Sequence, residues 1–192
     1  MDKTVGEVAK HSLGKMLDKT KNKGVPQRYL RNVNVRWFTF DLSDLFEMRF
    51  LPQEVTRYTA IRGDVLICEG GYPGRAAIWN EDYPIHFQKA LHRVRFHVPE
   101  HNKWFVYFLY AQDVSGELRQ HFTGTGIQHF TGDVLGHFQL PVPPLPELKR
   151  LVSGFEDLST ETQRLESIYR RKLAALDALK KSLLDQAFTG LL

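Results

Sequence analysis

The stretch Pro141-Val142-Pro143-Pro144-Leu145-Pro146-Glu147-Leu148 and the pattern that follows it decide the fold of this chain. Proline fixes φ and has no N–H, so a proline cluster does not sit inside a helix, yet Pro146 suits a first helical position. Beyond it, apolar residues recur at alternating four- and three-residue steps, a 3.5-residue period typical of a helix that lies along another helix. The apolar positions are Leu151, Phe155, Leu158, Leu165, Tyr169, Leu176, Leu179 and Leu183, and the skipped slots hold Thr162 and Lys172.

This pattern predicts one long helix over 146–188. At 1.5 Å per residue such a helix extends roughly 60 Å, which is longer than a compact domain built from the remaining residues. Much of its apolar stripe therefore needs a partner, and we expect this helix to join the chain to something else.

Composition predicts a soluble globular domain with an appendage. Of 192 residues, 42% are hydrophobic and 12% aromatic, enough for a core and too many for a disordered chain. A single cysteine, Cys68, excludes an internal disulfide framework and a four-cysteine zinc site, and it suits a reducing compartment. No signal peptide and no apolar run long enough to span a bilayer is visible. We expect a cytoplasmic protein without a membrane segment.

Positive charge is concentrated near the N-terminus. Residues 1–40 hold nine Lys or Arg against three acids, a net charge of +6, although the whole chain carries only +4. The cations are interleaved with asparagines and aromatic residues, a mixture that suits contacts to phosphates and base edges. The alternative is an ordinary solvated basic surface, and charge alone does not decide between the two.

The residues before the long helix predict a mixed α/β (α+β) domain. The alternating segment 33–40 indicates a strand, and 41–48, with an Asp and a Ser suited to capping, indicates a short helix. The segment 103–110 is apolar on all sides and fits a buried helix or a buried strand equally well. The prolines divide the chain into three parts: a domain over 1–140, a connector over 141–145 and the helical part over 146–192.

No catalytic or metal-binding arrangement emerges from the reactive residue types. The eight histidines give neither an H-E-x-x-H motif nor a Cys/His cluster. Cys68 lies in an apolar, strand-like run, where a cysteine is more often a small buried hydrophobe than a nucleophile. We therefore expect no enzyme activity, no metal and no cofactor.

Two glycine-containing segments remain open to two interpretations. Residues 70–75 are either a tight turn or a loop whose backbone approaches a phosphate beside Arg75, and they lack the motif of a P-loop. Residues 123–129 are either an ordinary surface loop or a base-reading loop, because Gln128, His129 and the threonines can hydrogen-bond base edges.

Several segments, taken together and in order, cover nearly the whole chain and carry a family resemblance. They are 12–18, 29–35, 63–66, 68–71 with 73–75, 87–89 with 92–94, and 126–130, then Pro143-Pro144-Leu145-Pro146-Glu147, and finally Ala187-Phe188-Thr189-Gly190 at the end of the helix. The chain resembles the specificity subunit of type I restriction-modification systems, and the proline-to-helix junction is the most specific part of the likeness. Leu148 departs from the glutamine usual after Pro-Glu in that family.

The resemblance implies a DNA-reading target recognition domain over 1–140 and a conserved spacer helix over 146–192, with no catalytic residues. It implies double-stranded DNA, adenine-N6 methyltransferase subunits and a restriction (motor) subunit as partners. A full specificity subunit has two such domains and two helices, whereas this chain has one of each. We therefore expect two copies to pair through antiparallel helices as a homodimeric coiled coil and to read two half-sites. The alternative is a helix-mediated interaction or regulatory protein without DNA affinity of its own.

The candidate DNA contacts are cations, amides and one imidazole. Phosphate contacts are expected from the lysines and arginines, and base contacts from the amides. The candidates are Lys15, Lys19, Arg28, Arg31, Asn32, Asn34, Arg75, Gln88, Lys89, Gln128 and His129.

Overall fold

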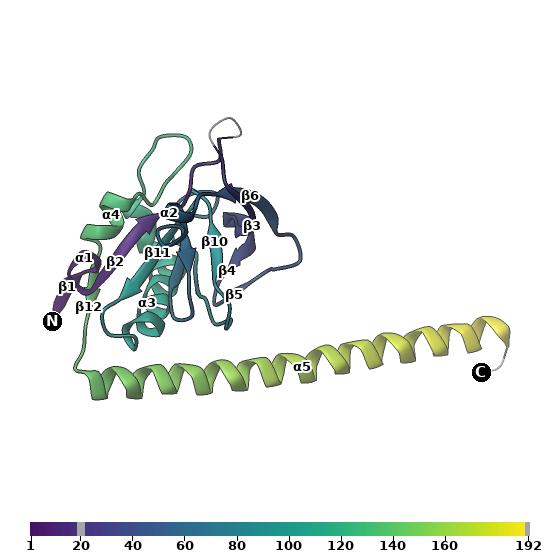
Figure 1. Ribbon diagram of the computed structural model, residues 1–192. Helices are drawn as coiled ribbons and strands as arrows, with labels where there is room; N and C mark the ends of the chain where they lie inside the picture. The colour runs from purple at the N-terminus through teal and green to yellow at the C-terminus, as the bar shows by residue number, and fades with distance from the viewer. Residues whose placement is uncertain (19–21, 191–192) are drawn as a thin grey trace. The chain divides into compact units, whose positions relative to one another are not determined.

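The computed structural model describes residues 1–18 and 22–190, and it divides the chain into two compact units. The first unit, Met1–Leu148, holds every strand and all helices but the last (Figure 1). The second unit, Lys149–Leu192, contains most of helix α5, Leu145–Thr189. The mixed α/β domain and the long C-terminal helix that the sequence predicts are both confirmed.

The first unit is built around an antiparallel four-stranded sheet in the order β2-β11-β8-β9. Successive side chains of a strand point to opposite faces, and in β8 both faces are buried. Val65 and Ile67 pack into one core cluster with helix α3, whereas Leu66 and Cys68 pack into a second cluster. The strands are β2 Ala9–Leu13, β8 Val65–Cys68, β9 Ala76–Ile78 and β11 Leu91–Phe96.

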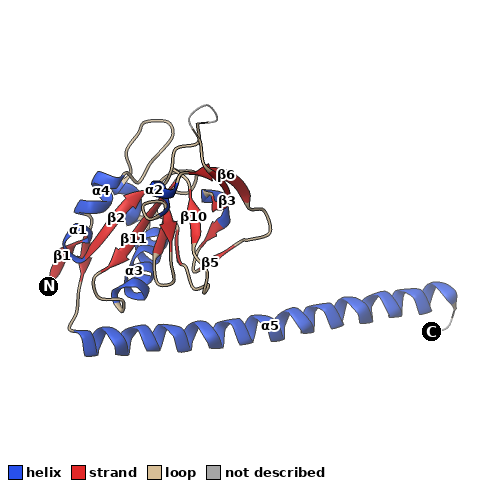
Figure 2. Ribbon diagram, viewed as in Figure 1, coloured by secondary structure: helices blue, strands red, loops and turns tan. Residues whose placement is uncertain are grey.

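A second four-stranded sheet, in the order β6-β3-β10-β7, contributes to the second cluster. Its central pair, β3 with β10, is parallel, and the other pairs are antiparallel. Leu30 of β3 and Phe87 of β10 are fully buried in that cluster beside Leu66. The first unit is therefore layered as α3, first sheet, second sheet (Figure 2). The strands are β3 Val25–Leu30, β6 Phe46–Phe50, β7 Thr59–Ala60 and β10 Ile85–Phe87.

The helix expected over 41–48 is wrong, because this segment turns and then enters strand β6. The Asp41 carboxylate accepts hydrogen bonds from the backbone N–H and the hydroxyl of Ser43, which closes a local turn and does not cap a helix. In β6, Met48 and Phe50 alternate into a small cluster with Tyr29. Apolar and charged residues alternate over 46–50, which is typical of a strand, but the Asp and Ser before them had favoured a helix.

The strand expected over 33–40 is only partly correct. Residues Asn32–Asn34 form a 3-10 turn, η1, and the rest is a hairpin of β4, Val35–Arg36, and β5, Thr39–Phe40. Phe38 in its turn has φ of 65°, which is uncommon for a bulky residue. The Phe38 ring packs with its centroid 5.0 Å from that of Tyr110 on α3, so contacts with α3 offset the backbone strain.

The segment 103–110, which the sequence left undecided, lies in helix α3, His101–Ser115. Phe105, Val106 and Leu109 face the first core cluster at helical spacing, and Gly116 ends the helix with φ of 82°. The shorter helices are α1 Val5–Val8, α2 Pro52–Val55, η2 Glu117–His121 and α4 Gly132–His137.

The two ends of the first unit are joined by a short ribbon. Strand β1, Asp2–Thr4, pairs antiparallel with β12, Gln139–Pro141. The amide of Val142 also donates to the Met1 carbonyl, at 2.9 Å. After β12 the proline segment leads into α5, and Leu148, the residue that departs from the family pattern, is buried.

Helix α5 is an unbroken helix of 45 residues that stops at Gly190. Gly190 has φ of 71°, the left-handed conformation that commonly terminates helices. Apolar side chains along it stay exposed, among them Leu158 at 66% and Leu176 at 61%. None of the helices in the described part of the chain is long and apolar enough to cross a bilayer.

Candidate nucleic-acid interface

Strands β3 and β10 bring separate parts of the sequence together at one edge of the second sheet. Their parallel pairing aligns Leu30 with Phe87, so the chain leaves both strands at the same edge. The backbone N–H of Gln88 donates to the Leu30 carbonyl at 3.1 Å, which places Gln88 beside Arg31. A third segment crosses here, because the Lys89 amide donates to the Lys15 carbonyl at 2.8 Å.

The glycine turn after β8 joins this edge through Asn32. The Asn32 amide group donates to the Gly70 carbonyl, and the Arg75 guanidinium donates to the Asn32 carbonyl, both at 3.1 Å. Gly71 has φ of +78°, and a Cβ there would lie 2.3 Å from the Asn32 side-chain nitrogen. Both the backbone conformation and the close approach therefore require glycine. The 70–75 segment is a tight turn whose shape depends on Asn32.

The 123–129 loop stands on the same turn. Thr123 and His129 exchange two backbone hydrogen bonds of 2.9 Å at the base of the loop, and the Phe130 amide donates to the Glu69 carbonyl. The tip is exposed, with Ile127 at 76% and Gln128 beside it. A hollow of about 360 Å³ separates this tip from Gly71 and its neighbours.

These five segments form one continuous surface, which we call the loop edge. It consists of residues 14–17, 31–33, 69–75, 88–90 and 123–130. The structure brings six of the candidate residues to it with exposed or half-exposed side chains: Asn32, Arg75, Gln88, Lys89, Gln128 and His129.

Lys15 reaches the loop edge only with its backbone. The residue is 5% exposed, and its ammonium donates to the Glu54 carboxylate at 2.5 Å and to the Arg49 carbonyl at 2.8 Å. The hydrogen bond from Lys15, with one from the Leu51 amide, holds the pKa of Glu54 below its usual range. An ammonium held inside the protein by these two partners is not presented to a phosphate, so Lys15 is a poorer candidate for a DNA contact than the sequence suggests.

Asn34 is likewise a poorer candidate for a DNA contact, because its side chain makes its hydrogen bonds inside the protein. It is 2% exposed, its oxygen accepts from the Arg31 amide, and its nitrogen donates to the carbonyls of Asp41 and Asp44. Each hydrogen-bonding group of the side chain is thus used to close the segment between β3 and β6. Asn34 is expected to shape the loop edge without touching DNA.

Arg31 is held between an acid and a ring. Its guanidinium donates to the Asp44 carboxylate at 2.6 Å and lies 3.6 Å from the centroid of the Phe46 ring. Its side chain is 17% exposed. A DNA phosphate would have to displace Asp44, so Arg31 is a poorer candidate than the exposed Lys89.

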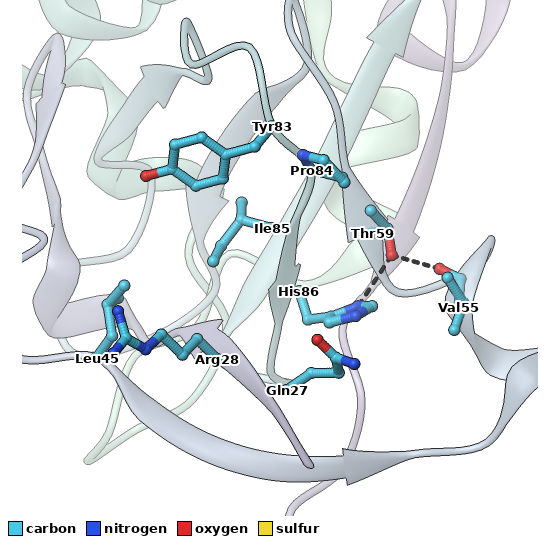
Figure 3. Close-up of a pocket in the computed structure, with 9 residues that line it drawn as sticks. All are labelled: Gln27, Arg28, Leu45, Val55, Thr59, Tyr83, Pro84, Ile85 and His86. Atoms are coloured by element: carbon cyan, nitrogen blue, oxygen red, sulfur yellow. Dashed lines mark hydrogen bonds between the residues drawn. The ribbon is translucent and has the colours of Figure 1, made fainter. Parts of the chain in front are cut away.

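Arg28 lies apart from the loop edge, on β3 beside a pocket of about 340 Å³ (Figure 3). In this pocket the Thr59 hydroxyl donates to the Val55 carbonyl at 2.5 Å and therefore accepts from Nδ1 of His86 at 2.9 Å. Burial lowers the pKa of His86, so the ring is neutral near pH 7 with its lone pair on Nε2. Together with the Gln27 amide, the pocket offers donors and acceptors suited to a planar polar group.

The remaining candidate, Lys19, lies outside the described residues. Conversely, reasoning from charge overlooked apolar side chains exposed at the loop edge, which suit contacts to thymine methyl groups and to sugars. No hydrophobic period or sequence motif marks these apolar residues, since each is a single residue in an irregular segment. They are Met16, Leu17, Val33, Tyr72 and Ile127.

The cysteine and the histidine with the most strongly shifted pKa values are buried in the protein. Burial raises the pKa of the Cys68 thiol to about 11, so it stays protonated and unreactive. Burial also lowers the pKa of His92 to about 4, and its Nε2 lies 3.1 Å from the Phe130 carbonyl oxygen. Within residues 1–18 and 22–190, no three His, Cys, Asp or Glu side chains are grouped as metal ligands.

Comparison with solved structures identifies the fold. One match, over 98% of this chain, is a chain from a study of complex assembly and conformational transition of the type I R-M system, with 20% identity and a TM-score of 0.77. Another, over the full chain, is the HsdS subunit from Thermoanaerobacter tengcongensis, with 22% identity and a TM-score of 0.70. A third, over 87% of the chain, is the type I S subunit from M. genitalium, with 14% identity and a TM-score of 0.57.

The present chain spans less than half of each of these relatives, covering 45%, 45% and 41% of their lengths. No curated protein matches the sequence significantly. A family model, the type I restriction modification DNA specificity domain, matches residues 2–172 and so includes both the first unit and more than half of α5. The chain therefore belongs to the type I restriction modification DNA specificity family, whose members recognise DNA and are not themselves catalytic.

Proposed function

We propose that this chain is a DNA-recognition component that reads one half of a two-part target for a type I restriction-modification system. The observation that carries the proposal is the family match over residues 2–172, which covers the loop edge together with more than half of α5. In this proposal residues 1–140 are the target recognition domain, 141–145 a rigid connector and 146–192 the spacer helix. The chemistry belongs to other subunits, and this chain selects where on the DNA it occurs.

The loop edge is the proposed reading surface. Lys89 and Arg75 contribute cations for phosphates, while Asn32, Gln88, Gln128 and His129 offer groups that hydrogen-bond base edges. These side chains come from four segments that hydrogen bonds join to one another, so the surface is already assembled before it meets DNA. Arg28, beside the pocket of Figure 3, supplies a further cation for the flanking backbone.

The proposed partners are adenine-N6 methyltransferase subunits and a restriction (motor) subunit. One of the similar chains comes from a study of complex assembly in a type I R-M system, which supports an assembly of this kind. A second copy of the chain supplies the other half of the target, through antiparallel pairing of α5. The stripe residues from Phe155 to Leu183 are exposed and support this pairing, because they would otherwise face water.

Mapping of methylated adenines tests the function directly. The chain is expressed with a type I methyltransferase subunit in a host lacking other adenine methylation, and the genome is sequenced for N6-methyladenine. We expect a two-part motif with inverted, identical halves. Asymmetric halves would contradict the homodimer, and absence of any motif in an assembled complex would contradict DNA recognition.

The alternative, an interaction protein without DNA affinity, is supported by the long exposed apolar stripe of α5. Filter binding with duplex DNA at low and moderate salt, with and without the methyltransferase subunit, separates the two. DNA recognition predicts binding that weakens with salt and needs the loop edge. The alternative predicts that the assembled complex binds DNA equally well when Lys89 and Arg75 are replaced by alanine.

A further inference from the structure

The apolar stripe of α5 is symmetric about Ser167. The ten seam positions, eight apolar residues with Thr162 and Lys172, are separated by steps of four and three that read the same in both directions. In an antiparallel pair centred on Ser167, every seam residue meets a seam residue of the other copy. The facing pairs are Leu151 with Leu183, Phe155 with Leu179, Leu158 with Leu176, Thr162 with Lys172, and Leu165 with Tyr169.

The ends of the helix obey the same symmetry. Leu145 and Thr189, its first and last residues, each lie 22 residues from Ser167. The start is set by the proline segment and the end by Gly190 in the left-handed conformation, so both limits are local features of the backbone. In this alignment the two helices overlap along their whole length.

The two polar seam residues fall in one layer. The Thr162 hydroxyl donates to the Leu158 carbonyl at 2.8 Å, which leaves its oxygen free to accept from an ammonium. Lys172 lies over the Tyr169 ring, with Nζ 5.6 Å from its centroid, so its stem follows the seam. A shift by one heptad in either direction would set Lys172 against Phe155, which has no hydrogen-bond acceptor, or against Tyr169, and would move its ammonium away from the Thr162 hydroxyl.

Charge along α5 favours the antiparallel direction. Residues 145–166 carry five acids and three basic residues, a net charge of −2, whereas 168–189 carry two acids and five basic residues, a net of +3. Antiparallel pairing places each negative half along a positive half of the other copy. Parallel pairing would align like with like and would weaken the pair.

We propose that α5 binds a second copy of itself, antiparallel, in the single register centred on Ser167, with Thr162 and Lys172 as the layer that fixes it. The inference rests on the proposed self-pairing and adds its register. It makes Ile168 a neighbour of its own copy across the twofold axis, because it is one residue from the centre. Glu161, one heptad earlier on the same side of the helix, would lie about 18 Å from its own copy along the axis.

Cysteine cross-linking of the full chain tests this register. The native Cys68 is buried, so the parent protein provides a background without reactive thiols. The variants Ile168→Cys and Glu161→Cys are treated with a short bis-maleimide whose reach is about one helix diameter, roughly 10 Å. We expect covalent dimers from Ile168→Cys, none from Glu161→Cys alone, and dimers again when Glu161→Cys is mixed with Ala175→Cys.

Each other outcome overturns part of the inference. Covalent dimers from Glu161→Cys and from Ile168→Cys, each by itself, would indicate parallel helices. A noncovalent dimer without the Ile168→Cys product would indicate another antiparallel register. A strict monomer by light scattering would refute self-pairing itself. None of these results would remove DNA recognition, which the methylation map tests separately.

Thr162 and Lys172 provide an independent test by charge. Thr162→Glu places a carboxylate opposite the partner's ammonium and should tighten dimerisation roughly tenfold, whereas Thr162→Lys should weaken it by a similar factor. In a Lys172→Glu background the two effects should exchange sign. Sedimentation equilibrium measures all four variants, and effects of Thr162 that do not depend on residue 172 would refute the shared layer.

Discussion

Replacing Lys15 by alanine should lower the stability of the folded protein and leave the salt dependence of its DNA binding unchanged. The Lys15 side chain is buried, and its ammonium is bound to the Glu54 carboxylate and the Arg49 carbonyl. Alanine leaves both of these groups without that partner. The sequence alone had suggested the opposite outcome, a loss of DNA affinity.

The size of the effect follows from the exposure of Glu54. Removing one partner of a fully buried ion pair destabilises a protein by roughly 3–5 kcal/mol. The Glu54 side chain is 26% exposed and still accepts from the Leu51 amide, so water and this amide compensate part of the loss. We expect about 2 kcal/mol, which lowers the melting temperature by about 4–8 °C in a protein of this size.

The pH dependence gives the same conclusion an independent check. The pKa of Glu54 is lowered in the folded protein, so its contribution to stability is present above its ordinary value of 4.5 and is lost as pH falls below it. In Lys15→Ala that acid-dependent loss should shrink, because the carboxylate no longer has its ammonium. Thermal unfolding by circular dichroism at pH 7 and pH 4 measures both effects.

Lys89→Ala is the matched control, because Lys89 is exposed and its backbone amide contacts the Lys15 carbonyl. Its melting temperature should stay near that of the parent. The slope of log affinity against log salt should decrease by about one unit, as expected for one lost phosphate contact. If Lys15→Ala instead melts like the parent and loses that unit of slope, the ammonium contacts DNA and our reasoning is refuted.

Three further predictions concern the turn, a buried histidine and the helix. Gly71→Ala should lower the free energy of unfolding by about 1–2 kcal/mol, measured by thermal unfolding, and should weaken DNA binding by displacing Asn32. Gly126→Ala is the control and should match the parent, because a Cβ there meets nothing within 4 Å. The pKa of His92 is lowered from 6.5 to about 4, so the free energy of unfolding should fall by about 3 kcal/mol as pH drops from 6.5 to 4. A His92→Gln variant that loses stability as steeply over this pH range would contradict this. Seven residues of matching heptad pattern inserted after Ser167 should lengthen each helix by about 10 Å and widen the gap between the methylated half-sites by about 3 base pairs, which methylation mapping would detect or refute.

The long helix could be predicted from the sequence because its signal is periodic and local. Pro146 and Gly190 mark its ends, and the 3.5-residue repeat is read without knowledge of any other element. The helix predicted over 41–48 was wrong because the signal for this segment is not local. Capping residues are also turn residues, and only pairing with β3 decides that residues from Phe46 on form a strand.

The candidate interface could be predicted as a set of segments but not as a surface. Asn32, Arg75 and His129 meet through a parallel strand pair and a glycine turn, and neither leaves a pattern along the chain. Lys15 shows the same limit at the level of one residue. Its burial depends on Glu54, which lies 39 residues away and belongs to no shared motif.

The ribbon between β1 and β12 brings the entrance and the exit of the first unit to one place. A unit whose two ends adjoin can be exchanged as a cassette, because a replacement need only match one short ribbon and the proline connector. The proposed reading surface and the proposed helix register can then change independently, since they share no residues. New DNA specificities could thus arise by substitution of one module, while the spacing between half-sites is inherited unchanged.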